Sequence, residues 1–193
     1  MKKTLVAVAV ALLTGCASEP KEPAAPPVDP NVAQARGITK NFADSLRSEL
    51  TAGMQAGGPT NAIAVCKDKA PAIAKAEKDK SGWQKVGRTS LKLRNPSNEP
   101  DDWELAVLKK FDQRKAAGED PAKIEYSEVV AAGGKKTFRY MKAIPTQEVC
   151  LACHGEKIDK ATAAKLATLY PKDKARGFKV GDLRGAFTMT KDL

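Results

Sequence analysis

Residues 136–154 read KTFRYMKAIPTQEVCLACH. The first part, 136–143, alternates well enough and holds enough aromatic and β-branched side chains to predict a strand. Ile144 and Pro145 then lead directly into Cys150-Leu151-Ala152-Cys153-His154. The sequence therefore predicts a strand that runs into a C-x-x-C-H loop.

This spacing of two cysteines and a histidine is typical of a haem c attachment site. Two cysteines three positions apart can add to the two vinyl groups of one porphyrin, and the histidine can then reach the iron as its fifth ligand. A zinc knuckle or a disulfide is the alternative, but zinc needs two further ligands at short spacing, and none lies nearby. We therefore expect one covalently bound haem c, held by Cys150, Cys153 and His154.

The rest of the chain reads as helices first and strands later. Gly53 and the run Gly57-Gly58-Pro59 are expected to end the first helix, and Pro71 to kink the second. The expected helices are 31–52, a second that starts at Thr60 or Asn61 and runs past Ile73, 100–117 and 160–169; the expected strands are 83–93, 124–130, 136–143 and 181–190. Gly133 and Gly134 indicate a hairpin between the middle two strands. The fold class is α+β: N-terminal helices packed on a small, mostly antiparallel sheet with a haem-binding loop.

Aromatic and aliphatic side chains at helical or strand spacing are the expected core. The helix 100–117 is expected to bury Trp103, Leu105, Leu108 and Phe111. Trp83, Trp103, Phe138 and Tyr140 are interpreted as core or haem-wall residues rather than electron relays.

The N-terminus predicts export. Lys2 and Lys3 precede a short apolar run, and residues 13–16, Leu-Thr-Gly-Cys, resemble the lipobox of bacterial lipoproteins. The resemblance implies a signal peptide over 1–15, acylation of Cys16 and a lipid anchor; a plain secretory peptide is the alternative. Residues 16–30 are Pro-rich and predict a tether, which leaves 31–193 as one domain. We expect the periplasmic side of a bacterial membrane, the outer membrane before the inner one.

The chain is basic. Its formal net charge is +10, and removal of Lys2 and Lys3 with the signal peptide would leave 31 basic and 23 acidic residues, or +8. No nucleic-acid-binding module accompanies this charge. It favours anionic surfaces and an acidic docking surface on a redox partner, although a lysine-rich solvated surface explains it equally well.

Several separated motifs resemble one family. They are Cys66 within AIAVCKDKAP, the turn Leu93-Arg94-Asn95-Pro96 with Asn98, Trp103-Glu104, Pro145 before the C-x-x-C-H loop, and the closing run GDLRGA over 181–186. Together they resemble the PAS-like c-type haem domain family, which occurs in secreted cytochromes and in sensor kinases. The similarity covers nearly everything from Asn31 onward.

Composition restricts the candidates for the sixth iron ligand, because the chain has one histidine and cannot supply bis-His ligation. The candidates are Met54, Met141, Met189, Cys66, a lysine, a tyrosine or an open site. Cys66 is the one thiol without a role in an oxidising compartment. The resemblance implies that Cys66 binds iron opposite His154; a buried free cysteine is the alternative, and Met141 is the next choice.

Two function classes follow. The first is a membrane-anchored monohaem cytochrome acting in extracytoplasmic electron transfer, and the second is a haem-based redox or gas sensor that works through a partner. An enzyme is not expected, because a peroxidase would need a distal acid–base pair for which no second histidine exists. Arg94 and Arg184 are candidate partners for the haem propionates, or ordinary surface arginines.

Overall fold

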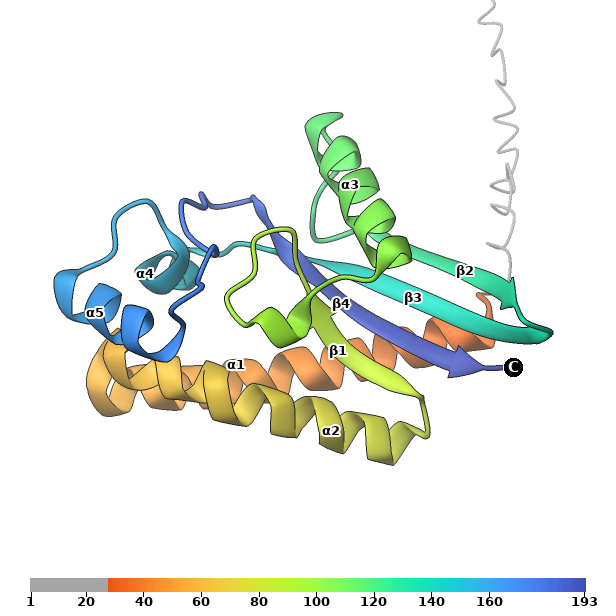
Figure 1. Cartoon of the computed structure of the whole chain (residues 1–193), viewed down its shortest axis with the longest axis horizontal. Coiled ribbons are helices and arrows are strands. Elements are labelled where there is room, and N and C mark those ends of the chain that lie inside the picture. Colours follow the sequence, from red (N-terminus) through yellow and green to blue (C-terminus); the bar gives the residue numbers. More distant parts are fainter. Residues whose placement is uncertain (1–27) are drawn as a thin grey trace, which may run out of the picture.

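The computed structural model describes residues 28–193; the predicted signal peptide, Cys16 and most of the predicted tether lie outside this range. A four-stranded antiparallel sheet forms the centre, with a pair of long helices on one face and a shorter helix, α3, on the other (Figure 1). This confirms the predicted α+β class. Within the described range no helix combines the length and the apolar character needed to cross a bilayer.

The long helices form a hairpin. Helix α1 (Pro30–Ala64) begins where Asp29 accepts a hydrogen bond from the Asn31 amide at 2.7 Å, and it loses helical geometry at Gly57 and Gly58. The chain turns back there, so that Asn61 donates to the Gly53 carbonyl at 3.1 Å. The predicted break at Gly57-Gly58-Pro59 is therefore present, although the helix before it runs beyond residue 52.

A wide π-helical turn, η1 (Val65–Lys69), interrupts the returning helix before α2 (Ala70–Ser81). The Ala70 amide donates to the Val65 carbonyl, five residues back. Pro71 follows at the start of α2, where its missing N–H costs no helical hydrogen bond. Cys66 lies in this π turn, and such turns are frequent at functional sites. The kink expected at Pro71 stays a prediction.

The sheet has the strand order β1-β4-β3-β2, and every neighbouring pair is antiparallel. The strands are β1 (Lys85–Thr89), β2 (Glu125–Ala132), β3 (Lys135–Pro145) and β4 (Leu183–Asp192). The predicted strand over 83–93 is too long, because the chain leaves the sheet after Thr89. The predicted hairpin at Gly133-Gly134 joins β2 to β3.

Short helices complete the domain. Helix α3 (Asp102–Ala116) starts with a capping box between Asp101 and Glu104, and α5 (Lys160–Leu169) is capped by Asp159. The remaining turns are η2 (Pro96–Asn98), η3 (Glu148–Cys150) and α4 (Leu151–His154).

Each face of the sheet has its own core. Towards α1 lie Phe42, Trp83, Phe138, Tyr140, Phe187 and Met189; towards α3 lie Leu108, Phe111, Ile124, Met141 and Ala186. Leu108 and Phe111 are buried as predicted, whereas Trp103 and Leu105 are only half-buried. The Trp103 indole N–H donates to Glu128 at 3.0 Å, which holds the ring at the surface.

An ionic contact fixes the first half of α1 to the sheet. Arg36 of α1 pairs with Glu125 of β2, and the buried Tyr140 hydroxyl donates to the same carboxylate at 2.7 Å. Burial and the bond to Glu125 raise the pKa of Tyr140, so the phenol stays a donor. The helix hairpin therefore has a defined position over β1, β4 and β3.

Candidate functional site

A cavity of about 650 Å³ lies between the helix hairpin, β1 with the loop that follows it, and the C-x-x-C-H segment. Its size is typical of a cofactor pocket, and aliphatic and aromatic side chains of α1 line one wall. Among them are Phe42, Leu46, Leu50, Ala62 and Ile63. The cavity is thus mainly apolar, and a small number of polar side chains also line it.

The C-x-x-C-H residues occupy one wall of this cavity. Cys150, Cys153 and His154 lie on η3 and α4, and all three line the pocket. The Thr146 amide donates to the Asp182 carbonyl at 2.7 Å, and the Gly181 amide to the Thr146 carbonyl at 2.9 Å. The segment that carries the motif is therefore anchored just before β4.

The imidazole of His154 is oriented by the backbone. Its Nδ1–H donates to the Ala175 carbonyl at 2.8 Å, so Nε2 carries the lone pair. Burial, with Arg184 and Arg94 nearby, holds the pKa of His154 well below its ordinary value and keeps the ring neutral. A neutral imidazole with its second nitrogen bonded to a carbonyl is the usual state of a metal-binding histidine.

Arg94 stabilises the loops around His154. It forms a buried ion pair with Asp173 at 3.2 Å and donates to the carbonyls of Cys153 at 2.5 Å and Ala175 at 3.2 Å. Burial alone would raise the pKa of Asp173, but hydrogen bonds from Arg94 and from the Ala175 amide outweigh it and lower that pKa. The guanidinium predicted to hold a propionate is thus engaged in joining two segments of protein.

Arg184 has partners in the loop that follows β1. It donates to the Ser90 hydroxyl at 3.1 Å and to the Lys92 carbonyl at 3.3 Å, and its guanidinium carbon lies 5.5 Å from the centre of the Phe178 ring. Burial and the neighbouring cations Arg94 and Arg88 lower the pKa of Arg184 to about 10. Its Nε donates a long hydrogen bond of 3.4 Å to Nε2 of His154.

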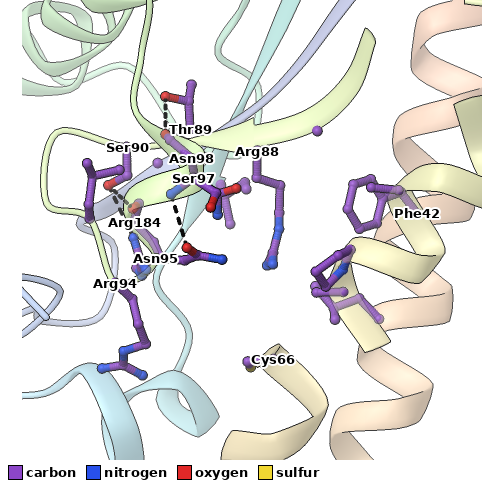
Figure 2. A pocket seen from close by; sticks show the side chains of 18 of the residues that line it. Phe42, Cys66, Arg88, Thr89, Ser90, Arg94, Asn95, Ser97, Asn98 and Arg184 are labelled. Atoms are coloured by element: carbon purple, nitrogen blue, oxygen red, sulfur yellow. Dashed lines mark hydrogen bonds between the residues drawn. The ribbon is translucent and has the colours of Figure 1, made fainter. Parts of the chain in front are cut away.

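Cys66 enters the same cavity from the helix hairpin. Its place on the π turn puts it among the pocket-lining residues with Cys150, Cys153 and His154, although it precedes them by a long stretch of chain. Figure 2 shows Cys66 below the Arg88 side chain. The three cysteines of the described residues form no disulfide. Burial, and Cys66 close by, raise the pKa of Tyr170 to about 12.

The methionines divide between cavity and core. Met54 lines the cavity, whereas Met141 and Met189 are fully buried in the cores on either face of the sheet and are absent from its lining. Met141 therefore loses its place as the next candidate ligand after Cys66, and Met54 takes it. Sequence proximity suggested Met141; strand alternation turns its side chain towards α3, on the face of the sheet away from the cavity.

These residues match a porphyrin better than a bare ion. Within 28–193 no three His, Cys, Asp or Glu side chains gather closely enough to cage a metal ion. The sulfur and nitrogen donors instead line the walls of one large apolar cavity. Separate sulfur and nitrogen donors around one large apolar cavity fit a haem.

One pocket residue was missed from the sequence. Arg88 of β1 lines the cavity between the helix hairpin and the loop over 90–99. Val86 and Arg88 share a face of β1, and Val86 belongs to the core towards α1. A charged residue at an inward position of an alternating strand was the signal that could have identified it.

Comparisons with known proteins agree with this arrangement. The Tll0287-like family model (Tll0287) matches residues 26–191. A solved structure described as the cyanobacterial haem protein Tll0287 is similar at 26% identity and a TM-score of 0.65, over 86% of this chain and 97% of that chain. No curated protein matches. The match spans nearly the whole described chain and confirms the resemblance to a PAS-like c-type haem family: the chain belongs to the Tll0287-like family.

Proposed function

We propose that the chain binds one haem c covalently, through thioether bonds from Cys150 and Cys153, with His154 and Cys66 as axial ligands. The observation that carries this proposal is the meeting of Cys66 with the C-x-x-C-H residues in one cavity. The printed description of the similar structure as a haem protein supports it. Bound haem would supply one-electron redox chemistry.

The protein's own groups fit these roles. The Ala175 carbonyl fixes the His154 ring and keeps Nε2 unprotonated, so that this atom could bind iron in place of its long contacts of 3.4 Å with Arg184 and Arg94. The Cys66 sulfur would donate electron density and favour the ferric state, which predicts a low reduction potential. The apolar walls from α1 would exclude water from the iron.

We propose extracytoplasmic electron transfer as the activity, without catalytic residues. The predicted acylated Cys16 would hold the domain at the periplasmic side of a membrane, with the outer membrane favoured, and the basic surface would attract a redox partner with an acidic docking face. A nucleic-acid partner is not part of this proposal.

Redox or gas sensing is the second candidate, because Cys66 lies on a π turn. Reduction of bound haem would weaken its bond to the Cys66 thiolate, and if that sulfur then took up a proton from solvent, CO or NO could bind in its place. A sensor of this kind would pass the change to a partner through the helix hairpin.

The test is low-temperature EPR of the ferric protein with the variants Cys66→Ala and Met54→Ala. Thiolate ligation predicts a low-spin signal with a narrow g-spread that disappears in Cys66→Ala and persists in Met54→Ala. The reverse pattern would assign the sixth position to Met54 and favour a higher-potential carrier. Ferrous protein that binds no CO at any pH would remove the gas-sensing candidate.

Covalent attachment and anchoring are tested separately. Cys150→Ala and Cys153→Ala should each leave a single thioether, seen as a changed pyridine haemochrome spectrum, and the double variant should lose haem on denaturation. Cys16→Ser should abolish palmitate labelling and release the domain from membranes. Unchanged fractionation of that variant would contradict the lipid anchor.

A further inference from the structure

The cations around the cavity differ in whether protein acceptors satisfy them. Arg94 pairs with Asp173, and Arg184 donates to Ser90 and to the Lys92 carbonyl. Lys85 pairs with the buried Glu104 at 2.5 Å. Among residues 28–193, no hydrogen bond or ion pair joins a side-chain acceptor or carbonyl to the guanidinium of Arg88.

Arg88 is nevertheless directed inwards. Figure 2 shows its side chain extending from β1 into the cavity, on the side where Phe42 and Cys66 lie. Its guanidinium carbon is 5.6 Å from the centre of the Phe42 ring. The strand register fixes this direction, because Arg88 lies opposite Phe187, a residue of the core towards α1.

A guanidinium in this position needs an anion. Arginine remains charged in proteins, and a buried charge without a partner is strongly destabilising. Arg88 is half-buried and lines the same cavity as Cys66. No carboxylate of the described chain pairs with it, so the anion must come with a ligand.

We propose that Arg88 is the carboxylate-binding residue of the cavity and pairs with a propionate of the bound haem. The inference rests on the proposed function, because the carboxylate is the cofactor's. A planar guanidinium matches a carboxylate through two parallel hydrogen bonds. Thioether bonds would hold the vinyl-bearing part of the ring at η3 and α4, while the propionates lie on the other part of the ring; β1 forms a different wall of the cavity.

This assignment replaces the arginines chosen from the sequence. Arg94 and Arg184 already have protein acceptors and lie within 3.4 Å of the Nε2 atom of His154, on the iron-binding side of the pocket. Their role is to position His154 and its loops. Arg184 has neutral acceptors only, whereas Arg88 has no hydrogen-bond acceptor in the described chain and is therefore the guanidinium most open to a carboxylate.

The experiment is resonance Raman spectroscopy of the haem-loaded full chain, in the region of the propionate bending modes. Arg88→Met should shift at least one of these modes to lower frequency, because the hydrogen bonds to the carboxylate are lost. Arg88→Lys keeps the positive charge but cannot form two parallel hydrogen bonds to a carboxylate, so the frequency of the affected mode should lie between those of the wild type and Arg88→Met. Arg47→Met, at an exposed position of α1, is the matched control and should leave the modes unchanged.

The outcomes separate the two proposals. Wild-type chain matured with the cytochrome c system but lacking covalent haem would overturn both. Haem-loaded Arg88→Met with wild-type propionate modes would overturn the Arg88 assignment alone. If the same variant changed the ferric EPR g-values without shifting a propionate mode, Arg88 would be a partner of the Cys66 sulfur, and the assignment would again be overturned. If Arg88→Met does not accumulate, wild-type propionate modes in Arg88→Lys overturn the assignment and the intermediate shift supports it.

Discussion

Arg94 and Asp173 form the most buried ion pair of the site, with side chains 7% and 2% exposed. Removing one member leaves the other charged and without its partner. We therefore expect Arg94→Met to lower the free energy of unfolding by about 3–5 kcal/mol, measured by urea denaturation. Lys40→Met removes an exposed pair with Asp44 and is the control, with almost no expected change. Equal effects of the two substitutions would contradict a role for Arg94 in holding the loops.

Single residues of the site were predictable where chemistry is local. The C-x-x-C-H spacing pointed to Cys150, Cys153 and His154, and the spare thiol with the family resemblance pointed to Cys66; all four residues line one cavity. The partners of Arg94 were not predictable, because Asp173 and Ala175 reach it only through the fold. Met141 was misjudged since nearness in sequence says nothing about which face of a strand a side chain occupies.

The helix hairpin depends on the backbone at its turn. Gly58 has φ +68° and ψ −163°, a region that side chains disfavour, and no atom lies within 4 Å of the position that a Cβ would take. Gly58→Ala should therefore cost about 1–3 kcal/mol through backbone strain alone. Gly37→Ala, in regular helix and also without neighbours, should instead stabilise by about 0.5–1 kcal/mol.

Thermal unfolding of both variants checks this pair. Opposite signs are expected from one chemical change, because the two glycines differ in backbone conformation and not in packing. A stable Gly58→Ala would mean that the hairpin can turn in another conformation.

Elements were predicted well where their boundaries carry a signal in the residues. Gly57-Gly58-Pro59 indicated the hairpin turn, and Gly133-Gly134 indicated the β-hairpin. Only Pro71 indicated an irregularity near Cys66, and a proline in a helix can be accommodated by several backbone distortions, so the sequence did not predict a π turn. Strand β1 was predicted too long because Ser90 to Leu93 continue the alternation while turning into the loop that lines the cavity.

Acid should weaken the whole molecule. Burial alone would raise the pKa of Glu125, but hydrogen bonds from Arg36 and Tyr140 outweigh it and lower that pKa below its ordinary 4.5. A lowered pKa contributes stability that is complete above about pH 4.5 and is lost as pH falls through the value in the folded state. The same sign holds for Asp173 and Asp101.

Urea midpoints measured from pH 7 to pH 3 test this. The wild type should be nearly constant down to about pH 5 and then decline. Glu125→Gln should be less stable at pH 7 by about 1–2 kcal/mol and lose less on acidification. Glu77→Gln, at a residue without ion pairs in the described chain, should follow the wild type.

The positive charge of the protein should affect its rates of electron transfer with small charged reagents. Oxidation of the ferrous protein by ferricyanide should slow by about tenfold as ionic strength rises from low to physiological, because the net charge attracts the anion. A cationic cobalt complex should show the opposite trend in stopped-flow measurements. Equal salt dependence for both reagents would contradict electrostatic attraction by the basic surface.

The sheet order could not be derived from the sequence. Four strands of suitable length allow several antiparallel orders, and nothing in β4 itself shows that it lies between β1 and β3. The strand order becomes clear only once the helices are packed on the sheet, with α1 and α2 on one face and α3 on the other.

The central place of β4 has a consequence for the order of folding. Strand β1, with Arg88, pairs only with β4, and β4 lies far from it in sequence. Pairings between distant segments form late, whereas the β2–β3 hairpin and the helix hairpin need only local contacts. Until residues 183–192 dock, β1 packs on the helix hairpin but lacks its strand partner, and the wall of the cavity next to the cysteine motif is incomplete. The interval before β4 docks is thus the period in which an attachment machinery would find both thiols accessible.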